Sequence, residues 1–111
     1  LTDAERRFLA KTVDYIYLLL DKQQLDVNTL AEKLCMSSRQ FHRKIVTLTG
    51  NSPAPSIRKI KMKRARYLLE TNPKLSADEI AFRCGFEHTS SFYHAFRKTY
   101  GYTPKEIRRG V

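Results

Sequence analysis

Arg39 and Arg43 lie four residues apart and carry side chains suited to binding a phosphate group or the edge of a base. A guanidinium donates two parallel hydrogen bonds, either to phosphate oxygens or to O6 and N7 of guanine. His42 and Ser38 beside them can each add a single hydrogen bond. Residues four apart share one face of a helix, so this chemistry requires a helix whose opposite face is buried.

The net charge of +10 comes from one third of the 111-residue chain. No Asp or Glu occurs between Lys33 and Leu69, whereas the remaining 11 basic residues are balanced by 11 acidic ones. Such a block favours a polyanion as partner, either nucleic acid or an anionic membrane, and the alternative is a solvated helix surface. The basic residues of the block are Lys33, Arg39, Arg43, Lys44, Arg58, Lys59, Lys61, Lys63, Arg64 and Arg66.

Other chemistries lack the residues that they need. No apolar run approaches the ~18 residues of a membrane span. Of the two polyanions we expect nucleic acid, and no membrane contact by this segment. Cys35 and Cys84 form neither a disulfide framework nor a zinc knuckle, which favours a reducing, cytoplasmic setting. His88 and His94 fall on different helix faces, and Ser91 near His94 has no acid partner. We therefore expect no catalytic site, no metal ion and no cofactor.

An internal repeat with an offset of about 50 residues indicates which elements position the basic side chains. Each copy reads as a short helix, a turn and a second helix, which is the pattern of a helix-turn-helix unit. The small Ala of each copy, Ala31 or Ala81, would let the second helix cross the first one closely. The corresponding residues include Leu30 and Ile80, Ala31 and Ala81, Phe41 and Phe92, Gly50 and Gly101, and Pro53 and Pro104.

In the first copy, Asp26 is the expected N-cap of the short helix. The turn falls at Cys35-Met36, where a left-handed Cys35 would be strained by ~1 kcal/mol. Ser37 and Gln40 then form a capping box, and Gly50 ends the second helix. The spacing predicts that this helix buries Phe41, Ile45 and Leu48 and exposes the two arginines.

The second copy has corresponding cap, turn and buried residues. Ser76 and Glu79 are expected to form a capping box, followed by the buried residues Ile80, Ala81 and Cys84. Gly85 makes the turn, and Gly101 ends a helix that buries Phe92 and Phe96.

Three further helices complete an all-α chain with seven helices. Thr2 and Glu5 cap a leading helix with Phe8, Leu9, Val13, Ile16 and Leu20 on its buried face. Ser52-Pro53 opens a long helix that ends before Asn72, and Thr103-Pro104 opens a short last helix. The predicted segments, together one domain, are a leading helix at 1–24, a helix-turn-helix at 25–50, a linker helix at 51–72, and a second helix-turn-helix with a closing helix at 73–111.

An ordered series of residues between positions 25 and 109 has the spacing of a known signature. In the second copy the series is Ile80-Ala81, Gly85-Phe86, Ser90, Phe92, Phe96-Arg97-Lys98, Gly101, Thr103-Pro104 and Arg108. In the first copy it is Leu30-Ala31, Met36-Ser37, Arg39, Phe41, Arg43-Lys44-Ile45, Leu48-Thr49-Gly50, Ser52-Pro53, Ile57-Arg58 and Ala65. The chain thereby resembles the AraC-type transcription regulators.

The resemblance implies two helix-turn-helix units that bind double-stranded DNA together and usually activate transcription, with RNA polymerase as a partner. The opening helix is similar to that of hybrid two-component regulators, which implies an upstream regulatory domain. Several positions depart from the pattern. His94 stands where a basic residue is usual, His88 where a short or acidic cap is usual, Lys61 where Arg is usual, and Ser56 and Ile107 where an aromatic residue is usual. The first two departures predict a weaker second unit.

The second helix of such a unit turns its N-terminal residues toward base edges in the major groove. The expected base-reading residues are Ser38, Arg39, His42 and Arg43 in the first copy, and Thr89, Ser90, Ser91 and His94 in the second. The expected phosphate contacts are Ser37, Lys44, Arg58, Arg97, Lys98 and Lys105. For Arg39 and Arg43 the alternative is phosphate binding. For the whole chain the alternative is a basic helical module that docks an acidic protein or RNA.

Overall fold

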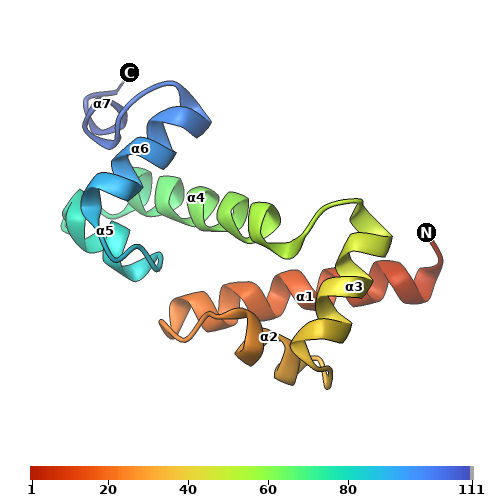
Figure 1. The fold of residues 1–111 in the computed structure, drawn as a ribbon. Coiled ribbons are helices and arrows are strands. Elements are labelled where there is room, and N and C mark those ends of the chain that lie inside the picture. Colours follow the sequence, from red (N-terminus) through yellow and green to blue (C-terminus); the bar gives the residue numbers. More distant parts are fainter. Residues whose placement is uncertain (111) are drawn as a thin grey trace. The chain divides into compact units, whose positions relative to one another are not determined.

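The computed structural model describes residues 1–110, which form helices joined by short turns and contain no strand (Figure 1). The all-α prediction and its seven helices are thereby confirmed within these residues. The helices are α1 (Asp3–Asp21), α2 (Val27–Lys33), α3 (Ser38–Thr49), α4 (Pro53–Thr71), α5 (Ala77–Arg83), α6 (Thr89–Tyr100) and α7 (Pro104–Arg108).

The chain divides into two compact units, Leu1–Ile60 and Lys61–Val111, and α4 contributes residues to both. In the first unit α2 packs against α1 and α3, and in the second α6 packs against α5 and α7. Each unit has its own buried core. The first core contains Ile16, Leu19, Leu30, Ala31, Phe41, Ile45 and Ile57. The second contains Met62, Ala65, Leu69, Ile80, Ala81, Cys84, Phe92 and Phe96.

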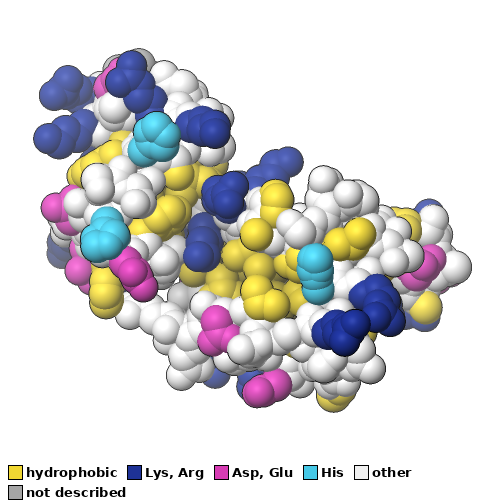
Figure 2. Space-filling model, in the orientation of Figure 1, with side chains coloured by type: hydrophobic (Ala, Val, Ile, Leu, Met, Phe, Trp, Pro, Cys, Tyr) yellow, Lys and Arg dark blue, Asp and Glu magenta, His cyan; other side chains and the backbone are white. Residues whose placement is uncertain are grey.

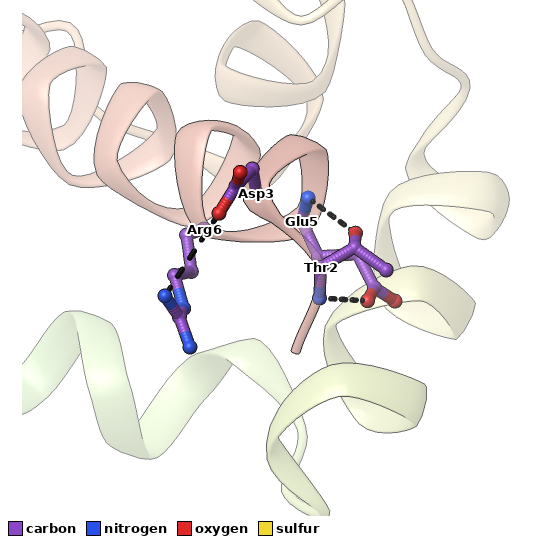
Figure 3. A network of polar contacts seen from close by, with 4 residues as sticks. All are labelled: Thr2, Asp3, Glu5 and Arg6. Carbon is purple, nitrogen blue, oxygen red and sulfur yellow. Dashed lines mark hydrogen bonds and ion pairs between the residues drawn. The ribbon is translucent and has the colours of Figure 1, made fainter.

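Side chains satisfy the free backbone groups at the helix starts, as the sequence predicted. At α1, Thr2 Oγ1 accepts the Glu5 N–H at 3.1 Å and the Thr2 N–H donates to the Glu5 carboxylate at 2.8 Å (Figure 3). The hydrogen bond from the Thr2 N–H to the carboxylate favours its ionised form and is the main cause that lowers the pKa of Glu5. Capping boxes also open α3, at Ser37, and α7, at Thr103, while the Asp26 carboxylate caps α2.

The two helix-turn-helix turns share one backbone hydrogen-bond pattern. In the first, the Cys35 N–H donates to Glu32 O and the Met36 N–H donates to Ala31 O, both at 2.9 Å. In the second, the equivalent donors are Gly85, to Phe82 O, and Phe86, to Ala81 O, both at 3.0 Å. This is a Schellman motif, which places the first residue after the C-cap in the left-handed region. Cys35 has φ 59° and Gly85 has φ 83°, so the strained cysteine is confirmed.

Replacing Cys35 with glycine should stabilise the chain by about 0.5–1 kcal/mol, because relief of the left-handed strain exceeds the extra entropy of an unfolded glycine. Thermal unfolding followed by circular dichroism would measure the change. Cys35→Ala is the matched control, since it removes the thiol and retains a Cβ at positive φ. A melting temperature that rises equally in both variants would assign the effect to the thiol instead of the backbone.

Two details of the predicted elements are wrong. Ser76 caps the Glu79 N–H at 3.0 Å, but the Glu79 carboxylate binds Arg83 at 3.2 Å instead of completing a capping box. Val13 is 39% exposed, and the buried residue at this level of α1 is Thr12. A threonine is tolerated there because its hydroxyl donates to the Phe8 carbonyl oxygen at 2.8 Å, which satisfies its polar group.

Candidate nucleic-acid interface

The outer face of α3 presents the three residues on which the sequence prediction most depended. Phe41 and Ile45 are buried in the first core, 1% and 4% exposed. This orientation leaves Arg39, His42 and Arg43 exposed on the other side of the helix. Among residues 1–110, neither of the two guanidinium groups forms an ion pair with a carboxylate. Their hydrogen-bond donors are therefore available to a ligand in solution.

At the N-terminal end of α3, two serines that the sequence analysis predicts to contact DNA also form hydrogen bonds within the protein. The Ser37 hydroxyl accepts the Gln40 N–H at 3.1 Å, and the Ser37 N–H donates to the Gln40 side chain at 2.9 Å. The Ser38 hydroxyl donates to the side-chain oxygen of Asn28 in α2. Ser37 keeps its hydroxyl proton for a further partner, and Ser38 keeps its acceptor lone pairs.

Lys44 lies on the side of α3 that turns toward α1. Its Nζ is 4.2 Å from the centre of the Phe8 ring, a cation–π contact between helices far apart in the sequence. Its positive charge also contributes to lowering the pKa of Glu5, after the hydrogen bonds from Thr2. Arg58, on α4, is exposed. Lys44 therefore has a structural partner, whereas Arg58 extends into solvent.

In the second unit α6 exposes a face that carries no positive charge near its start. Phe92 and Phe96 are fully buried, so the predicted readers Thr89, Ser90, Ser91 and His94 are all exposed. The predicted phosphate contacts Arg97 and Lys98 in the last turn of α6, and Lys105 in α7, are exposed as well. Figure 2 shows basic side chains on the surface of both units.

The sequence prediction missed two contacts between the paired helices. Besides the Asn28–Ser38 bond, the Tyr93 hydroxyl of α6 donates to Asp78 of α5 at 2.8 Å. Burial, and then Asp78, raise the pKa of Tyr93. Asn28 and Asp78 are equivalent in the repeat, so a polar residue at one position links the two helices in both units. The repeat offset places Asn28 and Asp78 at the same position, and this match could have indicated from the sequence that both contact the second helix.

His88 is the N-cap of α6 and makes no side-chain capping hydrogen bond. His88→Ser should therefore stabilise the chain by about 1 kcal/mol, since the serine hydroxyl can accept a first-turn N–H without adding charge. The melting temperature should rise by about 4–8 °C. His94→Ser, on the same helix but away from its start, is the control. A similar rise in both variants would contradict the capping explanation.

Two other arginines are occupied within the second unit. Arg66 binds Glu70 at 2.8 Å and lies 5.0 Å from the ring of Tyr100. Arg108 donates to the carbonyl oxygens of Leu69, at 3.4 Å, and Asn72, at 3.0 Å. It thereby joins α7 to the C-terminal end of α4, where free carbonyl groups favour a cation. The signature position of Arg108 thus has a structural role.

The described residues contain no group of three or more His, Cys, Asp or Glu side chains placed to hold a metal ion. None of the helices in this part of the chain is both long and apolar enough to cross a membrane.

A short helix with a buried apolar face, a tight turn and a second helix with an exposed outer face, present twice, define a helix-turn-helix protein. A family model described as a helix-turn-helix domain matches residues 30–110. The chain belongs to this family, the AraC-type helix-turn-helix domains, as the sequence signature predicted.

Relatives of known class agree with this assignment. The transcriptional activator RhaS of Escherichia coli is 31% identical over 87 residues, which cover 78% of this chain and 31% of RhaS. The chain thus spans about a third of that relative's length. The C-terminal domain of AraT, a response regulator from Geobacillus stearothermophilus, is 30% identical with a TM-score of 0.76, covering 94% of this chain and 85% of that one.

A third relative was solved with its ligand. The DNA-binding domain of AdpA, a global transcriptional factor in complex with a target DNA, is 33% identical with a TM-score of 0.71. The match covers 98% of this chain and 93% of that domain.

Proposed function

We propose that the chain binds double-stranded DNA with sequence preference, with α3 and α6 as the two recognition helices. The observation that carries this proposal is the exposed face of α3, where Arg39, His42 and Arg43 have no acidic partner among the described residues. A helix of this kind enters the major groove, and its arginines reach guanine edges. The solved complex of AdpA with DNA supports the same use of the domain.

The two helices read DNA by different chemistry. In α3, Arg39 and Arg43 form bidentate contacts to guanine, and His42 and Ser38 contribute single bonds. In α6, the short side chains of Thr89, Ser90, Ser91 and His94 suit thymine methyl groups, single hydrogen bonds and bridging water. Backbone phosphates fix the register of both helices. The proposed phosphate ligands are Ser37, Lys44, Arg58, Arg97, Lys98 and Lys105.

The domain works within a transcription regulator of the bacterial cytoplasm. The relative RhaS is named an activator and AraT a response regulator, which supports activation as the output and a regulatory domain upstream. RNA polymerase is then the partner on which activation depends. The chain itself has no catalytic role in this proposal.

Selection of binding sites from a random pool of duplex DNA tests the proposal. We expect enrichment of two short motifs about ten base pairs apart, one for each recognition helix. If about six phosphates are neutralised, affinity should fall as roughly the fifth power of salt concentration. Enrichment of one motif would limit base reading to one helix. DNA retained at low salt without any enrichment would support docking of an acidic protein or RNA instead.

A further inference from the structure

The first unit contains an apolar cavity of about 180 Å³ behind α3, partly open to solvent. Its walls come from the middle of α1, the inner face of α3 and the first two turns of α4. The lining includes Phe41 and the four isoleucines Ile16, Ile45, Ile57 and Ile60, and no charged residue. The cavity opens to solvent on one side, where its wall residues Val13 and Ser56 are exposed.

Two of the three hydroxyl groups on the wall, those of Thr12 and Thr49, are already used by the protein. Thr12 Oγ1 donates to the Phe8 carbonyl oxygen at 2.8 Å. Thr49 Oγ1 donates to the Ile45 carbonyl oxygen at 2.8 Å and accepts the Asn51 N–H at 3.1 Å. An ordered water needs two to four polar partners, and the remaining wall hydroxyl, that of Ser56, supplies only one. A charged ligand would lose its hydration without compensation.

We propose that this cavity is a binding site for an uncharged molecule with a single aromatic ring. A dry apolar cavity of about 150 Å³ accepts benzene in another protein, so the volume here suffices for one ring with a small substituent. Ser56 has a short side chain on the wall. An aromatic side chain at this position would occupy the space that the ligand needs. The site needs no DNA, and it goes beyond the proposed function.

The isoleucines provide a direct test on the intact chain. The chain has six, of which Ile16, Ile45, Ile57 and Ile60 line the cavity, while Ile80 and Ile107 lie in the second unit. Benzene, titrated into protein labelled at isoleucine methyl groups, should shift the four cavity resonances saturably and leave the other two unchanged. We expect a dissociation constant of about 1 mM or below. Benzoate, with the same ring and a charge, should shift none of them.

Variants then place the ligand. Ser56→Phe should weaken benzene binding at least tenfold by filling the cavity. Ala54→Phe adds the same ring at an exposed position outside the lining and should leave binding unchanged. If Ser56→Phe does not fold, the wild-type shifts decide. Shifts confined to the four cavity methyl groups support the site. The absence of saturable shifts, equal shifts at all six methyl groups, or full binding by folded Ser56→Phe overturns it.

Discussion

Replacing Arg43 with alanine is expected to remove the preference for guanine at one position of the selected DNA site. It should also weaken binding to that site by about fivefold to 150-fold, because a bidentate arginine–guanine contact contributes about 1–3 kcal/mol. Arg43 is exposed on α3 and has no acidic partner within the described residues, so its loss should leave the fold intact. Repeating the site selection and measuring Kd for each base at that position tests this.

Two further variants separate base reading from electrostatic binding. Arg58→Ala, at a proposed phosphate contact, should weaken all sequences equally and reduce the salt slope by about one. Arg6→Ala, which removes a residue near Asp3 at the start of α1 (Figure 3), should leave DNA binding unchanged. If Arg43→Ala instead weakens every sequence to the same degree, Arg43 binds phosphate.

Replacing Ala31 with leucine is expected to destabilise the first unit by about 1–3 kcal/mol, which corresponds to a fall in melting temperature of about 5–15 °C. Ala31 is fully buried in α2, and its carbonyl oxygen accepts the Met36 N–H that forms the turn. A larger side chain there must separate α2 from its neighbours or adopt a strained rotamer. Thermal unfolding by circular dichroism measures the effect.

Ala10→Leu is the matched control for Ala31→Leu, because Ala10 is exposed on α1 and has room for the same added atoms. Its melting temperature should stay within a few degrees of the wild-type value. An unchanged melting temperature for Ala31→Leu would refute the argument that a small residue is required where the helices cross.

Local chemistry made the helices predictable from the sequence. Caps such as Thr2, Ser37 and Thr103, and stops such as Gly50, act within a few residues of their own positions, and the structure has the predicted helices there. The exposed placement of Arg39 and Arg43 followed in the same way from the spacing of Phe41 and Ile45. Which of these side chains contact DNA stays a prediction.

Contacts across helices were not predictable, because they depend on how the helices cross. The Asn28–Ser38 and Asp78–Tyr93 bonds join different helices, and Lys44 meets Phe8 across 36 positions of sequence. The family pattern did indicate that Ser56 is smaller than the usual residue. The cavity that Ser56 lines is a consequence that only the assembled helices display.

The left-handed position of the turn, Cys35 in the first unit and Gly85 in the second, limits which residues each unit can accept in evolution. At Cys35 a mutation to glycine relieves strain, so the first unit can accept the residue that the second already has. The reverse change at Gly85 would bring a side chain into the left-handed region. Its Cβ would also lie 3.3 Å from Lys61 Nζ, which rests near the Phe86 ring. Glycine is therefore tolerated at the turn of either unit, whereas a residue with a side chain is tolerated at Cys35 and strained at Gly85.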